Sequence, residues 1–148
     1  MGQINARDWI FEISDQAATP VWTEIDRVTE FTLNRGENGE TADLTTFQSQ
    51  GIHESQAQQR GATLEITGRK VLDDAGAPDP GQDLVEQAAA KVGAESHVPI
   101  RFRHVNQTEW TQWTAHLAPG ELGGGNNDMT SWAFTATRSG PATVEAVA

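Results

Sequence analysis

Four histidines are the residues of this chain best suited to bind a metal or move a proton: His53, His97, His104 and His116. No two of them form an H-x-x-x-H or H-E-x-x-H pair, the spacing that places two imidazoles on one helix face around zinc. His104 and His116 could still meet on neighbouring strands, but a surface position on a strand explains each of them more simply. We therefore expect no metal site.

Two loops also fall short of known ligand-binding patterns. Asp73, Asp74 and Asp79 lack the D-x-[DN]-x-[DN]-G order and the closing glutamate of a calcium loop. The glycines at 123–125 are not followed by the Lys-Ser or Lys-Thr of a phosphate loop. No serine stands in G-x-S-x-G, and the absence of cysteine excludes disulfides and thiol catalysis. We expect neither an enzyme nor a bound cofactor.

The chain is acidic, with 10 Lys and Arg against 21 Asp and Glu and a formal net charge of -11. Nucleic-acid-binding proteins need a basic surface to displace phosphate counterions, so this charge argues against DNA as a ligand. The acidity either aids solubility or keeps the surface from holding DNA that passes it. Charge alone does not separate these two explanations.

The length of 148 residues fits one domain. No run approaches the roughly 20 apolar residues of a membrane span. The N-terminal MGQINARDWIFEIS shows no cationic segment followed by a continuous apolar one. We expect a soluble protein that is used without signal-dependent export.

Alternation of apolar and polar residues predicts strands through most of the chain. The strongest signals lie at 8–14, 21–34 with a break near 26–27, 61–68, 98–105, 110–117 and 129–137. The polar segment 52–60 extends the strand at 61–68 but has no apolar face. Leu64 and Ile66 share the predicted core face, and Glu65 points away from it.

One helix is predicted at about residues 80–92. Asp79 is the expected N-cap, Pro80 occupies the first helical position, and Gln82 is placed to complete a capping box. Gly93 is a suitable terminator. The elements together predict a mainly β fold, a sandwich or barrel with one flanking helix and a long hairpin loop.

Residues 35–51 form a long polar stretch without clear periodicity, in which Leu44 and Phe47 are the only large apolar residues. Loops of this length in a small domain are usually functional or disordered, so we expect this one to dock on another surface. The neighbouring segment 52–60, which is polar on both faces, also favours assembly, because such a strand suits a surface that lines a water-filled space. A second reading remains open, in which the tryptophans form a carbohydrate-binding platform: Trp9, Trp22, Trp110, Trp113 and Trp132.

The order of several segments resembles the tail tube (major tail) proteins of long-tailed phages and, more distantly, the tube proteins of contractile injection and secretion systems. The segments are VTEFTLNRG, ADLTTFQSQG, GATLEITGRKV, PGQDLVEQ, IRFR and GGGNNDMTSWAFTAT, after a short W-x-F-x-I strand. The most specific pieces are residues 43–47, similar to a D-x-T-x-F loop of the family, and residues 126–128 leading to 132–134. The resemblance covers nearly the whole chain.

The resemblance implies a single tail-tube domain at 1–148 that assembles into stacked hexameric rings in the virion tail. It implies an inter-ring loop at 35–51, with contacts from Asp43, Leu44 and Phe47, and a C-terminal arm at 139–148. The implied partners are other copies of the chain, together with tape measure, tail terminator and distal tail or baseplate proteins, assembled in the host cytoplasm without a membrane. Many relatives carry an added immunoglobulin-like domain, which we do not expect here.

The family also implies a lumen through which double-stranded DNA leaves without specific binding. DNA carries a charge about every 1.7 Å, so a basic lining would hold it, whereas acidic and neutral polar groups would repel it modestly over ~8 Å. Strand parity gives the candidate lining residues Glu30, Thr32, Glu54, Gln56, Gln58, Thr63 and Glu65. The alternation of faces is not fixed across the break at Gly61, so half of these residues could face a neighbouring subunit instead.

Overall fold

The computed structural model describes residues 2–16 and 19–147. Its strands are β1 (Trp9–Ser14), β2 (Trp22–Glu24), β3 (Val28–Asn34), β4 (Glu40–Asp43), β5 (Ser55–Gln59), β6 (Thr63–Arg69), β7 (His97–His104), β8 (Glu109–Pro119), β9 (Ser131–Arg138) and β10 (Thr143–Ala146). The α-helix of the described residues is α1 (Pro80–Ala89), and three 3-10 turns are η1 (Ala6–Asp8), η2 (Phe47–Ser49) and η3 (Gly93–Ser96).

Most of the strands belong to one eight-stranded antiparallel sheet, in the order β2-β1-β7-β8-β9-β6-β3 with β10 beside β8. β9 and β10 pair with successive parts of β8, since Arg138 lies opposite Ala115 and Thr143 opposite Gln112. Gly140, with a φ of 83°, turns the chain between them. Residues 143–146 of the predicted C-terminal arm are therefore an edge strand of the body.

The sheet curls until its two ends face each other. The ring of Phe31 on β3 lies 5.0 Å from that of Phe11 and 5.6 Å from that of Trp9, although β1 and β3 are far apart in the strand order. The chain crosses this gap at residues 25–27, where Arg27 has a φ of 60°. The predicted mainly β class is confirmed, as one curled sheet that does not close into a barrel.

The concave side of the curled sheet holds the core, and the alternation in sequence predicted its members. Ile13, Leu64, Ile66, Phe134 and Ala136 are all at most 1% exposed. Glu65, between two of them, is exposed. The assignment of strand faces at 61–68 is thus confirmed.

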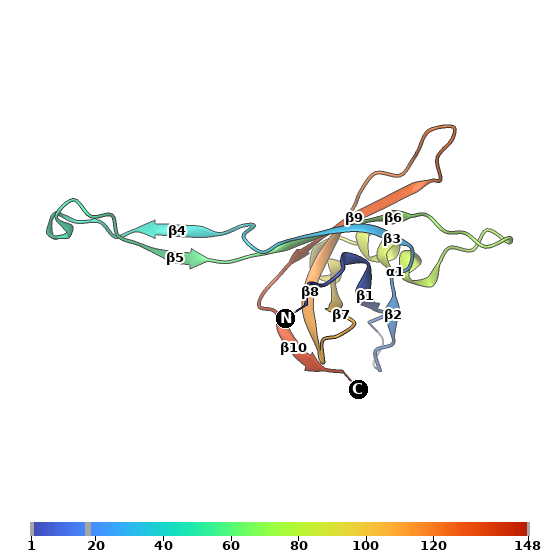
Figure 1. Ribbon diagram of the computed structural model, residues 1–148, viewed down its shortest axis with the longest axis horizontal. Coiled ribbons are helices and arrows are strands. Elements are labelled where there is room, and N and C mark those ends of the chain that lie inside the picture. Colours follow the sequence, from blue (N-terminus) through green and yellow to red (C-terminus); the bar gives the residue numbers. More distant parts are fainter. Residues whose placement is uncertain (1, 17–18, 148) are drawn as a thin grey trace.

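Helix α1 covers one opening of the curled sheet (Figure 1). The Asp79 carboxylate accepts hydrogen bonds from the Gly81 and Gln82 backbone N–H groups at 3.1 and 3.3 Å, as expected of an N-cap. A Cβ on Gly81 would overlap the Glu24 carbonyl, so only glycine lets the helix start approach the β2–β3 corner this closely. The helix ends at Ala89 rather than near residue 92, because Val92 is 85% exposed and offers no buried face.

The predicted capping box is wrong, because Gln82 has a different role. Its buried side chain donates to the Arg69 carbonyl at 2.6 Å and the Asp26 carbonyl at 3.4 Å. It accepts from the Val71 N–H at 3.1 Å. Gln82 therefore satisfies backbone groups where β6 ends and β3 begins, and in this way fixes the helix to the sheet.

Among residues 2–16 and 19–147, no helix has both the length and the apolar character needed to cross a membrane.

Candidate assembly surfaces

A long two-stranded arm is the most prominent feature outside the body. β4 and β5 pair with each other alone and continue the lines of β3 and β6 away from the body (Figure 1). Asp43 lies opposite Ser55 and Glu40 opposite Gln59. The stretch 35–51, predicted to be without regular structure, thus contains β4 and η2. A hairpin with solvent on both faces needs no alternation of apolar and polar residues, so this pattern did not predict its strands.

Polar hydrogen bonds shape the tip of the arm, residues 43–54. The Asp43 carboxylate accepts from the Thr45 N–H at 2.9 Å, and the Thr45 hydroxyl accepts from the Glu54 N–H at 3.0 Å. The Ser49 hydroxyl donates to the Glu54 carboxylate. Hydrogen bonds from the backbone and then the hydroxyl of Thr45 lower the pKa of Asp43 below its ordinary value of 3.8. The tip therefore holds its form without an apolar core.

Apolar side chains point outward from this polar frame. Phe47 is 95% exposed, Ile52 68% and Leu44 46%. The structure therefore brings the predicted contact residues Asp43, Leu44 and Phe47 together at the tip. Sequence analysis missed Ile52, although a large aliphatic residue in a segment with no core face was a signal that could have found it.

The second surface is the outer face of β3, β6 and β9, which we call the threonine face. Thr32 lies opposite Glu65, which lies opposite Thr135; Asn34 lies opposite Thr63, which lies opposite Thr137. Glu30 lies opposite Thr67 on the same face. The structure thus gathers four of the predicted lining residues on one surface: Glu30, Thr32, Thr63 and Glu65. Thr67 and Thr135 lie on the same face, because the pairing of neighbouring strands brings them beside Glu30 and Glu65.

The remaining three lining candidates lie elsewhere. Glu54 is in the tip, and Gln56 and Gln58 belong to the arm, where Gln56 pairs with Ala42. The arm separates from the body at Gly61, where a Cβ would lie 2.7 Å from the Glu37 carbonyl oxygen. One continuous strand had been predicted here, and the structure instead has two strands in two sheets.

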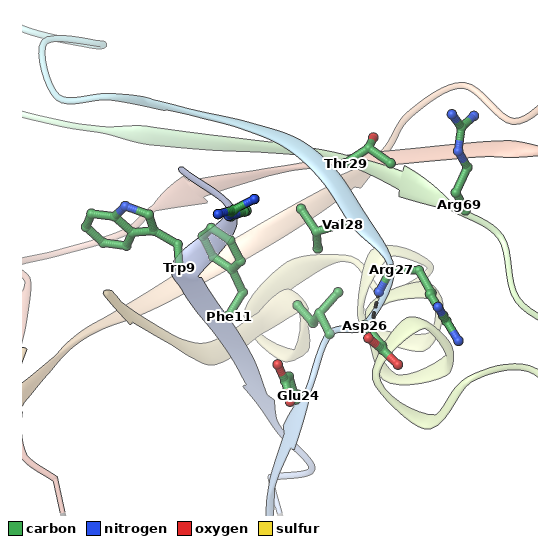
Figure 2. A pocket seen from close by; sticks show the side chains of 10 residues that line it. Trp9, Phe11, Glu24, Asp26, Arg27, Val28, Thr29 and Arg69 are labelled. Atoms are coloured by element: carbon green, nitrogen blue, oxygen red, sulfur yellow. Dashed lines mark hydrogen bonds between the residues drawn. The ribbon is translucent and has the colours of Figure 1, made fainter. Parts of the chain in front are cut away.

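A cavity of about 400 Å³ lies where β1 and β3 face each other (Figure 2). Trp9, Phe11 and Val28 form its apolar side. Its polar side mixes the acids Glu24 and Asp26 with the arginines Arg7, Arg27 and Arg69. Burial, followed by the charges of Asp26, Glu12 and Asp79, raises the pKa of Glu24 above its ordinary value of 4.5. The Thr29 hydroxyl in its lining donates a hydrogen bond to the Thr67 carbonyl at 3.1 Å.

His104 and His116, the two histidines that could have met on neighbouring strands, lie apart. His116 pairs with His97 across β7 and β8, whereas His104 lies at the other end of β7 with its ring 5.9 Å from that of Trp9. Within the described part of the chain, no group of three or more His, Cys, Asp or Glu side chains could hold a metal ion.

The tryptophans do not form an exposed row. Trp113 and Trp132 are core residues, and Trp110 is 6% exposed. The Arg101 guanidinium lies between the rings of Trp110 and Trp22, 4.2 and 4.3 Å from their centroids. It also forms an ion pair with Glu12 at 2.5 Å. These aromatic faces are used within the chain, in the core or against arginine.

No protein-family model and no curated protein sequence matches this chain. Solved structures do match. A chain in the virion of a native gene transfer agent particle is similar over 97% of this chain and 100% of that chain, with a TM-score of 0.72 and 17% identity. A chain in the C6-symmetric tail of the empty gene transfer agent particle matches with a TM-score of 0.71 and 17% identity, again over 97% of this chain and 100% of that chain. A chain in the six-fold symmetrised baseplate of the anti-feeding prophage matches with a TM-score of 0.59 and 12% identity, over 99% of this chain and 98% of that chain.

The fold is thus one that occurs in tail-like particles. The resemblance to tail tube proteins and to contractile injection systems is confirmed at the level of the fold. At these identities the likeness concerns the fold alone.

Proposed function

We propose that this protein is a non-enzymatic structural subunit of a phage-tail-like tube, assembled from stacked rings of six copies in the virion tail. The observation that carries the proposal is the whole-chain match to a chain in a C6-symmetric tail, over 97% of this chain and all of the other. A match over 97% of this chain and all of the other supports the same architecture, including the arm. In this proposal residues 1–148 act as one domain.

The arm supports assembly on physical grounds. Every residue of β5 and all of β4 except the half-buried Ala42 are exposed, and the tip presents Phe47, Ile52 and Leu44 to water. Such a hairpin contributes no buried apolar surface to a monomer. Clustered apolar exposure of this kind marks a protein-binding surface. We assign the tip, with Asp43, Leu44 and Phe47, to contact between rings, and residues 139–148 to a secondary contact of the same kind. Tape measure, terminator and baseplate proteins would meet the ends of the tube.

The threonine face supports a lumen-lining role. It presents hydroxyls and the carboxylates of Glu30 and Glu65, and its one arginine, Arg69, lies at its edge. Such a surface stays hydrated and offers few cationic groups that could bind DNA phosphates. We therefore assign Glu30, Thr32, Thr63 and Glu65 to the channel. Glu54, Gln56 and Gln58 would then line it only if the arm also follows the lumen.

A second candidate is the tube of a contractile injection system, which the match to the anti-feeding prophage baseplate favours. The two candidates share ring and tube geometry and differ in what passes through the lumen.

Negative-stain electron microscopy of the purified protein over a range of concentrations tests the proposal. We expect six-fold rings and, at high concentration, tubes with a central channel. A protein that stays monomeric at every concentration, and in the presence of a preformed tail end, would contradict it.

A further inference from the structure

A second cavity, of about 320 Å³, opens at the base of the arm. Phe102 and Trp113, which are 5% and 3% exposed, form its floor with Trp9. The rings of Phe102 and Trp113 meet edge to face at 5.2 Å. Arg35, Arg138 and Ala142 lie at its mouth. We call this cavity the arm-base pocket.

The mouth of the arm-base pocket carries two arginines that form no ion pair with another described residue. The Arg138 guanidinium lies 5.9 Å from the Trp113 ring, and its buried Nε has no hydrogen-bond partner among the described residues. Neither Arg138 nor Arg35 takes part in an ion pair within the described part of the chain. Buried donors are nearly always satisfied, so this mouth suits an occupant that brings a carboxylate.

The arm tip offers the complementary chemistry. Phe47 is 95% exposed, and the acidic residues Asp43 and Glu54 belong to the same tip. A cavity of about 150 Å³ is enough for a benzene ring, so the arm-base pocket has room for a phenyl group and a neighbouring aliphatic side chain. Aromatic rings on the floor would add edge-to-face contact with it.

The occupant cannot be the tip of the same chain. The arm leaves the body at Gly61 and the tip ends at Glu54, so the extended chain between them carries the tip roughly 20 Å away at ~3.3 Å per residue. The hairpin runs directly outward from the body (Figure 1). Only a second copy can bring Phe47 to this pocket.

We propose that the arm-base pocket of one copy receives the Phe47 tip of another, with the tip carboxylates at Arg35 and Arg138. This inference rests on the proposed function, because it names the surface that receives the arm during assembly. The contact is heterologous: each copy uses its tip on one neighbour and its pocket on another. Such contacts propagate without end and offset successive copies by the length of the arm, which is the geometry of stacked rings.

Two single variants and their mixture test the contact. Phe47→Ala removes the aromatic ring of the tip. Ala142→Trp, at an exposed position of the pocket mouth, fills the arm-base pocket. Each should keep the wild-type circular dichroism and melting curve but raise the concentration needed for tube formation about thirtyfold or more, as loss of an interface hot spot does. Ala94→Trp, at an exposed position of η3, is the matched control and should assemble normally.

The mixture of the two variants gives the sharper result. The intact tip of Ala142→Trp can enter the intact pocket of Phe47→Ala, but no further contact can follow. Sedimentation velocity should show a complex that ends after one tip-to-pocket step, which neither variant forms alone. Tubes from Ala142→Trp alone, with Phe47→Ala inactive, would overturn the pocket assignment and leave the proposed function intact. A wild-type protein that never assembles would contradict the proposed function itself.

Cysteine cross-linking covers the case in which Ala142→Trp does not fold. The chain has no cysteine, so the pair Gln48→Cys and Ala142→Cys in one chain introduces the sole thiols. Mild oxidation of assembled protein should give a ladder of covalent oligomers, because each copy is linked on two sides. The pair Gln48→Cys and Ala94→Cys should give none. A ladder from the control pair, or none from the test pair in intact tubes, would contradict the proposal.

Discussion

The body and the arm of this protein are both antiparallel β structure, yet different forces hold them. In the body, alternate side chains are buried: the pattern along β6 places Leu64 and Ile66 at 1% exposure on one side of the sheet. In the arm, every residue of β5 is exposed, and hydrogen bonds alone define the tip. The body thus has a packed interior, whereas the arm has none, and in the proposed assembly another copy covers the apolar residues of its tip. A subunit of an ordered polymer needs both kinds of region.

The largest effect should come from the body core. Leu64→Ala or Ile66→Ala should lower the free energy of unfolding by about 2–5 kcal/mol, because each leaves a cavity in a packed interior. Phe47→Ala, at the tip, should leave it unchanged. Urea denaturation of the monomers measures both. A loss for Phe47→Ala as large as for Leu64→Ala would show that the arm is part of the folding core.

Two glutamines give the same comparison for hydrogen bonds. Gln82→Ala should destabilise by about 1–3 kcal/mol, because buried backbone groups at Arg69 and Val71 lose their partner. Gln59→Ala removes a bond to the Asn38 carbonyl in the exposed arm, where water replaces it. Its effect should be close to zero. Equal effects in thermal unfolding would mean that the exposure of the arm does not govern its energetics.

A charge reversal separates the two regions by function. On the proposed ring, Glu65→Lys places six cations around the channel at every level, and these attract DNA phosphates. DNA release from particles carrying this variant should slow, most at low ionic strength where screening is weakest. Glu54→Lys, in the tip, should change assembly rather than release. Wild-type release by Glu65→Lys particles at all salt concentrations would exclude the threonine face from the lumen.

The smallest effect concerns Glu24 beside the β1–β3 cavity. Burial and the neighbouring carboxylates raise its pKa, so the folded protein holds this proton more tightly than the unfolded chain does. The ionised carboxyl therefore opposes folding above its folded-state pKa, and the opposition disappears as the pH falls through it. Glu24→Gln should be slightly more stable than wild type at neutral pH and equal to it well below pH 4.5. Glu40→Gln, on the arm, is the control. A gain for Glu24→Gln that persists at low pH would contradict the electrostatic cause.

The sequence by itself determined the local features of the body. Alternation fixed which side of each strand meets the core, as at Phe134 and Ala136, because a half-buried strand must repeat every two residues. Asp79 and Pro80 marked the start of α1, because capping is a contact between near neighbours in the chain. The break near Asp26 and Arg27 was also visible. The order of short segments was enough to predict the fold family.

Only the tertiary structure decided which faces adjoin and which surfaces remain unused. Phe11 and Phe31 meet because the whole sheet curls. Gln82 leaves its expected capping role because β6 ends and β3 begins beside it, with free backbone groups. The arm separates Glu54 and Gln56 from Glu65, although a single continuous strand had been predicted to hold them together. The arm-base pocket joins Trp9, Phe102, Trp113 and Arg138 from four strands. Contacts of this kind depend on pairing between distant segments, and no local pattern in a sequence encodes the register of a strand with a partner many residues away.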